Sequence, residues 1–462
     1  MTASSLPAGP RRPAVAQTLE WVFAPQRFML RSARRYGNAF TARLGPGSYV
    51  VFLSDPASVR AVFHGTPEEM HLGDINGLFR RVLGRDSLLV IDGDAHLRRR
   101  RQLLPPFNGA RVAGHYAAMV AAARAEVAQW PVGEPLALQP RMQAMTLNVI
   151  LAAVFGLTDG PRRDELRGLL ARLLELNTTL ATTLPQLRLE LGGLSPWGKL
   201  MRHTERVDRA VYAEIARRRA QAERPDDVLS LLLDAGDGAG EPMSDSALRD
   251  QLLTLLVAGH ETTATALAWA FERILRHPRV VDRIRVELAD GDTSYLDAAI
   301  KESLRLRPTV PITARKLTVP FQLDGRTYPA GTVLMPCIFL LHRNPAVHPE
   351  PDEFRPERFL GREPPPYSFI PFGGGVRRCL GSGFALAEMR AVMRTVFTNV
   401  ELNVVAERDE RIARRAFTLS PARGAQVVVA GRLEAPPLRT RRSRFAPSGN
   451  EAAVDHYAPA LE

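Results

Sequence analysis

The sequence contains very little cysteine and very little lysine. Among 462 residues the cysteines are Cys337 and Cys379, and the lysines are Lys199, Lys301 and Lys316. Two cysteines cannot build a disulfide framework or a cysteine-rich zinc site. The net charge of +12 is therefore carried almost wholly by arginine. These arginines are spread over helix-like stretches with no aromatic-studded basic patch, so we expect an acidic protein partner and no nucleic acid.

Long apolar runs are also missing. No run of 18 apolar residues is uninterrupted, and the longest candidate, LLTLLVAGHETTATALAWAF, is broken by His260 and Glu261. The first residues, MTASSLPAGPRRPAVAQ, lack the apolar core of a signal peptide. We therefore expect a cytoplasmic protein, monomeric and without a transmembrane anchor.

What is present predicts a mainly α fold with small β-sheets. Helical periodicity dominates from Pro56 to Ser303 and includes one long helix from about Ser244 to Arg276. Short strand-like runs around Asp324-Gly325 follow, and a hairpin is expected within FTARLGPGSYVVFLSD. We expect one domain over residues 16–431, with a flexible leader (1–15) and a disordered basic tail (432–462).

The segment FGGGVRRCLG, residues 372–381, allows three interpretations. A phosphate-binding loop fails, because Arg378 stands where the dinucleotide fingerprint needs glycine and no Gly-Lys pair is present. A buried structural cysteine is the default for Cys379 but leaves the glycines and arginines unexplained. A metal-binding thiolate accounts for all of them: a following helix stabilises the thiolate, Phe372 shields it, and Arg377 pairs with a cofactor carboxylate.

Five positions of this segment carry a family resemblance. Phe372, Gly375, Arg377, Cys379 and Gly381 match F-x-x-G-x-R-x-C-x-G, so the chain resembles the cytochrome P450 monooxygenases. The resemblance implies the cytochrome P450 fold, with haem b between the long central helix and the cysteine-bearing loop. It makes Cys379 the iron ligand and the other four positions part of the haem contact.

Further motifs occur in the order that the family has them. Glu302 and Arg305 match its E-x-x-R motif and, with Arg358 of PERF, are expected to form a buried structural network. The following three residues are expected to contact the haem propionates: His96, Arg100 and Arg315.

The stretch AGHETT, residues 258–263, lies midway along the long helix. It does not match the zinc motif H-E-x-x-H, because Ala264 replaces the second histidine. It could be a plain helix crossing whose threonines bond back to carbonyl groups. In the family, Ala258 leaves room for O2, and Glu261 with Thr262 forms the acid–alcohol pair that relays protons to the reacting oxygen.

The resemblance implies a haem-thiolate monooxygenase that hydroxylates or epoxidises a lipophilic molecule such as a fatty acid, terpenoid or polyketide. The expected pocket includes Ala258, Val310, Ile312 and Phe417. No flavin or dinucleotide segment is present, so electrons should come from a separate ferredoxin or flavodoxin with its NAD(P)H reductase, docking near Cys379. The alternatives are a peroxide-dependent peroxygenase and a non-catalytic haem-binding sensor.

Overall fold

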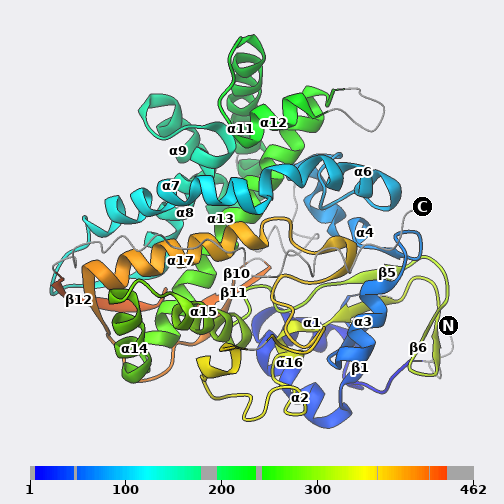
Figure 1. Ribbon diagram of the computed structural model, residues 1–462. Helices are drawn as coiled ribbons and strands as arrows, with labels where there is room; N and C mark the ends of the chain where they lie inside the picture. Colours follow the sequence, from blue (N-terminus) through cyan, green and yellow to red (C-terminus); the bar gives the residue numbers. More distant parts are fainter. Residues whose placement is uncertain are drawn as a thin grey trace.

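The computed structural model describes residues 6–45, 49–177, 195–235, 242–361, 363–415 and 417–433. Helices make up most of it, and small sheets lie at its edges (Figure 1). The helices are α1 (Ala14–Phe23), α2 (Pro25–Tyr36), α3 (Pro56–His64), α4 (Gly73–Asn76), α5 (Arg80–Leu83), α6 (Gly93–Leu103), α7 (Gly109–Val127), α8 (Leu138–Phe155), α9 (Gly160–Asn177), α11 (Pro196–Ala220), α12 (Val228–Asp234), α13 (Asp245–Leu275), α14 (Pro278–Ala289), α15 (Ser294–Leu306), α16 (Ile338–Leu341) and α17 (Ser382–Asn399), with short 3-10 turns η1 (Gly77–Phe79), η2 (Pro105–Phe107), η5 (Pro356–Phe359) and η6 (Gly375–Arg377).

The long helix α13 is the centre of the molecule. It has 31 residues and so spans about 45 Å at ~1.5 Å per residue. It begins where the sequence predicted, because the Ser244 hydroxyl accepts a hydrogen bond from the Ala247 N–H and caps the first turn. Helices α8, α11, α15 and α17 pack against it, so nearly its whole surface is enclosed (Figure 1).

The largest sheet has five strands in the order β1-β2-β8-β5-β3. Strands β1 and β2 form the antiparallel hairpin predicted from the sequence, and β8 joins β2 in parallel. Phe40 of β1 and Phe52 of β2 stack with ring centroids 4.8 Å apart, which anchors the hairpin to the core. These strands are β1 (Ala39–Arg43), β2 (Tyr49–Leu53), β3 (Met70–His71), β5 (Arg315–Leu317) and β8 (Val333–Pro336).

Three smaller sheets complete the β structure. Strands β4, β12 and β9 form one sheet, while β10-β11 and β6-β7 are hairpins. The predicted turn at Asp324-Gly325 joins β6 to β7, and both turn residues have positive φ, 51° and 69°. The strands are β4 (Pro135–Ala137), β6 (Phe321–Leu323), β7 (Arg326–Tyr328), β9 (Val400–Val404), β10 (Ile412–Arg415), β11 (Thr418–Pro421) and β12 (Gln426–Arg432).

Two large apolar clusters meet along α13. One contains the end of the helix from Ala264 onward, with α14, α15 and α17. The other contains its first half up to Val257, with α9, α11 and α12. Residues 258–263, which carry the AGHETT motif, belong to neither cluster. The motif therefore lies at the junction of the two halves of the core.

The ends of the described chain are held by the sheets. The Thr41 N–H of β1 donates to the Ala8 carbonyl, so residues that precede α1 lie along this strand. Residues 1–5 of the predicted leader lie outside the described residues. At the other end, the Leu433 N–H donates to the Asn399 carbonyl, and residues 434–462 of the predicted tail lie outside the described residues. Over the described parts of the chain, no helix combines the length and apolar character needed to cross a membrane.

Candidate functional site

The middle of α13 carries a narrow open stripe. From Ala247 to Leu275 every residue is buried except Leu255, Ala258, Gly259 and Thr262. These positions are spaced i, i+3, i+4 and i+7, so they share one face of the helix. All four are half-buried, and alanine and glycine give this face the smallest side chains of the helix middle. Leu255 is a member of the stripe that the sequence did not single out.

The two threonines of the motif bond back to the helix. The Thr262 hydroxyl donates to the Ala258 carbonyl at 2.7 Å, and the Thr263 hydroxyl donates to the Gly259 carbonyl at 2.9 Å. This is the local bonding that the simpler interpretation of the motif expects. Because Thr262 lies on the half-buried stripe, its hydroxyl oxygen, which still has a lone pair to accept a hydrogen bond, is not fully enclosed by protein.

Glu261 is buried and is held by residues from two other elements. Gln143 of α8 donates its side-chain N–H to one carboxylate oxygen at 2.6 Å, and Nε of Arg415, in β10, lies 3.3 Å from the other. Burial raises the pKa of Glu261, while Arg415 and Gln143 act in the opposite direction. The sequence around Glu261 does not predict either partner.

Gln143 also fixes the neighbouring residue. Its backbone carbonyl lies 2.8 Å from Nε2 of His260, so Nε2 carries the proton. Burial lowers the pKa of His260 to about 4, and the imidazole is therefore neutral near pH 7. One residue of α8 thus positions two consecutive residues of the motif.

The loop that carries Cys379 is shaped by glycine and by backbone hydrogen bonds. Gly375 has a φ of 64°, and a Cβ atom there would lie 2.3 Å from the Phe63 carbonyl oxygen, so only glycine fits. The Cys379 N–H donates to the Phe372 carbonyl at 3.0 Å, which closes the loop. Helix α17 then starts at Ser382, three residues after Cys379.

The Cys379 sulfur is surrounded by protein yet open to solvent on one side. The other cysteine, Cys337, is fully buried. Burial raises the pKa of the Cys379 thiol, whereas the Gly381 N–H and the charges of Arg100 and Arg378 lower it. These three groups stabilise a thiolate, which is the form that binds metal.

Cationic groups gather near this loop without enough acidic partners. Burial, followed by the charges of Arg377, Arg100 and Arg315, lowers the pKa of the buried His96 to about 3. Neither His96 nor Arg100 has a side-chain hydrogen bond or ion pair with any described residue. Within the described parts of the chain, the Arg315 side chain donates to the Thr313 hydroxyl and the Ala314 carbonyl and to no carboxylate. This cluster suits a ligand that brings its own carboxylates, as haem does.

Arg377 has an acidic partner within the protein that the sequence did not predict. Its guanidinium contacts the Asp92 carboxylate and donates to the carbonyls of Leu88 at 3.0 Å and Ile91 at 2.6 Å. Asp92 also accepts from the N–H groups of residues 72–74. Arg377 therefore already has a protein carboxylate as partner, and its expected contact with a haem propionate stays a prediction.

The expected charge network is assembled. Glu302 and Arg305, both in α15, form a bidentate pair at 2.7 and 2.9 Å, with both side chains fully buried. Nε of Arg358, in η5, lies 3.3 Å from the same carboxylate. Arg305 also donates to the carbonyl groups of His342 and Pro351, and it thereby ties α15 to the segments that lead to the cysteine loop.

The expected substrate-pocket residues are partly exposed. Val310, Ile312 and Phe417 are all half-buried, as is Ala258 on α13. Phe417 lies in the turn between β10 and β11, and its ring packs edge-to-face on Phe79 with centroids 6.3 Å apart. Apolar side chains from three separate segments are therefore available to contact a ligand.

These features together fit haem. A solvent-open thiol with N–H and arginine neighbours can hold iron, and the cationic cluster can hold carboxylates. The shallow stripe of α13 has the small side chains that a flat macrocycle and O2 require. The simpler alternative, a buried structural cysteine, describes Cys337, which is fully buried, whereas Cys379 is exposed.

Comparison with known proteins gives the same result. The cytochrome P450 family profile matches residues 7–428. The chain is 40% identical over 442 residues to cytochrome P450 135B1 of Mycobacterium tuberculosis, covering 93% of this chain and 92% of that protein. It is also 40% identical over 427 residues to cytochrome P450 138 of the same species, covering 92% and 96%. Among solved structures, retinoic acid-bound cyanobacterial CYP120A1 superposes with a TM-score of 0.82 at 26% identity, covering 93% of this chain and all of that chain.

These findings confirm the resemblance first seen around Cys379, together with the predicted mainly α fold, the enzyme class and the cofactor. The chain belongs to the cytochrome P450 family, and it is a haem b-dependent monooxygenase.

Proposed function

We propose that this P450 hydroxylates or epoxidises a lipophilic small molecule with electrons from a separate ferredoxin or flavodoxin. The open stripe of α13 carries the proposal, because it offers apolar contacts and a single hydroxyl group, that of Thr262. When bound, haem supplies the activation of O2: one oxygen atom enters the substrate, the other leaves as water, and two electrons and two protons are consumed.

Five residues would hold the haem. Cys379 would bind the iron as a thiolate, helped by the Gly381 N–H and Arg100. His96, Arg100 and Arg315 would bind the propionates, which would supply the negative charge that this cluster lacks. Arg377, whose bond to Asp92 fixes the loop beside these residues, would add its guanidinium to the propionate contacts.

Glu261 and Thr262 would deliver protons. In the structure the Thr262 hydroxyl donates to the Ala258 carbonyl, and Glu261 is held by Gln143 and Arg415. A relay requires the Thr262 hydroxyl to rotate away from this carbonyl and Glu261 to exchange a partner for water. Burial raises the pKa of Glu261 and so favours its acting as a proton donor.

The substrate would be a fatty acid, a terpenoid or a polyketide. Leu255, Ala258, Ile312 and Phe417 present apolar surface, and such surface favours a ligand of low polarity. The retinoic acid of the CYP120A1 structure is itself a lipophilic isoprenoid acid, which supports this class.

The electron donor would be an acidic protein that docks beside the cysteine loop. The arginines on this side include Arg100, Arg101 and Arg378, of which Arg101 is exposed. A basic face favours encounter with an acidic partner and makes the encounter sensitive to salt.

The decisive experiment uses the two cysteines as a matched pair. Reduced holoprotein under carbon monoxide should show the spectrum of CO trans to thiolate; Cys379→Ser should abolish it and Cys337→Ala should retain it. Turnover is then followed with O2, NAD(P)H, reductase and ferredoxin, and separately with peroxide alone. Product only with peroxide would replace the proposal by the peroxygenase alternative, and product under neither condition would favour the sensor.

A further inference from the structure

Helix α1 exposes an apolar ridge. Val15, Leu19 and Phe23 are 70%, 52% and 68% exposed, and their spacing of four residues places them along one side of the helix. The other large hydrophobic side chains exposed in the described structure are scattered over separate elements, which is ordinary for a protein surface. Three exposed hydrophobic side chains in a row on one helix are unusual for a protein surface, and they indicate a contact surface.

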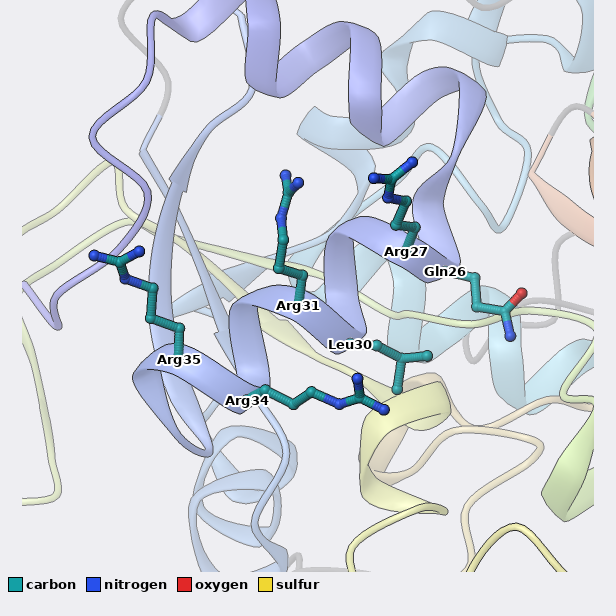
Figure 2. A pocket seen from close by; sticks show the side chains of 6 residues that line it. All are labelled: Gln26, Arg27, Leu30, Arg31, Arg34 and Arg35. Carbon is teal, nitrogen blue, oxygen red and sulfur yellow. The ribbon is translucent and has the colours of Figure 1, made fainter.

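Helix α2 next to it presents arginine. Arg27, Arg31, Arg34 and Arg35 line a surface hollow together with Gln26 and Leu30. Figure 2 shows Arg27 and Arg31 reaching toward α1, while Arg34 extends to the other side of α2.

Charge in this region is strongly one-sided. Residues 6–36 contain six arginines and one acidic residue, Glu20, which gives a net charge of +5. Glu20 is bound by both Arg12 and Arg31, and Arg31 thereby links α2 to α1. Glu20 lies three residues before Phe23 and is its neighbour on the helix surface, so this link keeps arginine beside the apolar ridge.

Aromatic packing fixes the position of α1 relative to α2. Trp21 of α1 packs edge-to-face on Phe28 of α2 at 6.0 Å and on Phe52 of β2 at 5.5 Å. The buried Gln17 donates to the Pro10 and Arg12 carbonyls. The ridge and the arginines therefore keep their relative positions without a ligand.

We propose that this α1–α2 surface binds the interface of an anionic lipid bilayer. The ridge of Val15, Leu19 and Phe23 would enter the boundary between headgroups and acyl chains, and the arginines would contact lipid phosphates. A nucleic acid would neutralise the arginines but leave the ridge in water, so the apolar side chains favour lipid. Such binding is peripheral and reversible, and it does not depend on which substrate the haem site accepts.

Holoprotein is tested by sedimentation with vesicles of phosphatidylglycerol and phosphatidylcholine in equal amounts, and with vesicles of phosphatidylcholine alone. We expect binding to the anionic vesicles only, weakened by added salt. A surface arginine contributes about fivefold in affinity, so Arg27→Gln with Arg31→Gln should lower binding about 25-fold. Leu19→Gln with Phe23→Gln should lower it by about tenfold or more.

Matched controls come from helix α14. Val286 is 64% exposed and Arg279 is also exposed, so Val286→Gln and Arg279→Gln should leave vesicle binding unchanged. The CO spectrum of every variant reports whether the haem site is intact. Equal binding to both vesicle types, or equal losses in the α14 controls, would overturn the proposal.

Two further outcomes would also overturn it. A DNA duplex that binds more tightly than the anionic vesicles, and loses affinity in the α2 variants, would make this a nucleic-acid surface. A dimer in the absence of lipid that Leu19→Gln with Phe23→Gln dissociates would make it an interface between two copies of the chain. These assays need no turnover, so their failure is separate from a failure of the proposed reaction.

Discussion

The carboxylate of Glu302 and the guanidinium of Arg305 meet at 2.7 Å, and both side chains are fully buried. Removing Glu302 would leave Arg305 and the adjacent Arg358 without their shared acidic partner in the interior. We expect Glu302→Gln to lower the free energy of unfolding by about 3–5 kcal/mol and to reduce the haem content of the purified protein.

The control for that variant is an exposed pair. Arg172 and Glu175 of α9 lie 2.6 Å apart with side chains more than half exposed. Glu175→Gln should change the free energy of unfolding by less than about 1 kcal/mol. Urea denaturation and haem absorbance are measured for both variants side by side. Equal losses of stability and haem in the two would contradict a structural role for Glu302.

Thr262 and Thr263 offer a second matched comparison, because both donate to carbonyls of α13 but only Thr262 lies on the open stripe. We expect Thr262→Ala to lower product formed per NAD(P)H consumed by about 10²-fold, with hydrogen peroxide released instead. In Thr263→Ala the product formed per NAD(P)H consumed should equal that of the parent enzyme. Unchanged coupling in Thr262→Ala would remove the hydroxyl from the proton relay.

Arg415 should set the pH range of that relay. Its positive charge opposes the rise that burial causes in the pKa of Glu261. Arg415→Gln removes this opposition, so the pKa of Glu261 should rise further and the limb of the pH–rate profile that reports it should move to higher pH. The double variant with Glu261→Gln should lack that limb altogether; a limb that survives belongs to another group.

His348 should contribute to the pH dependence of stability. Burial lowers its pKa to about 4, and its Nε2 lies 3.0 Å from the Ser368 carbonyl. Between the unfolded pKa of about 6.5 and the folded value, the unfolded chain binds a proton that the folded protein does not. Stability is therefore lost as the pH falls through this window.

His348→Gln keeps a hydrogen-bond donor but removes the titration. The slope of unfolding free energy against pH, measured by urea denaturation between pH 4.5 and 7, should become smaller by up to about 1.4 kcal/mol per pH unit. An unchanged slope would show that His348 does not titrate differently in the two states.

Bulk on the open stripe of α13 should block the substrate without disturbing the iron site. Ala258→Leu adds bulk at a half-buried position of this stripe, so the optical shift that a lipophile causes in ferric haem should be lost while the CO spectrum remains. Ala220→Leu, at the exposed end of α11, serves as control. A retained optical shift in Ala258→Leu would place the ligand elsewhere.

Features fixed by short stretches of chain could be predicted from the sequence. The Ser244 cap, the turn at Asp324-Gly325 and the glycine-shaped loop at Cys379 each depend on the conformation of a few consecutive residues. The helical periodicity of the apolar positions likewise predicted the length of α13.

Contacts made by tertiary packing could not be predicted in this way. Gln143 and Arg415 reach Glu261 only because α8 and β10 pack against α13. Arg377 has a motif position but takes Asp92 as its partner, since the fold brings the start of α6 beside it. Leu255 joins the open stripe because its neighbours on α13 are covered by other helices, which periodicity alone does not reveal.

The narrow opening on α13 also bears on how such an enzyme diversifies. Four positions within about two turns are half-buried, while every other position between Ala247 and Leu275 is buried. A substitution outside those four positions first affects the stability of the fold. A substitution at Leu255 or Ala258 changes which ligand can fit and has little effect on stability. New substrate preferences in descendants of this chain should therefore arise at these few positions of α13, with the rest of the helix staying constant.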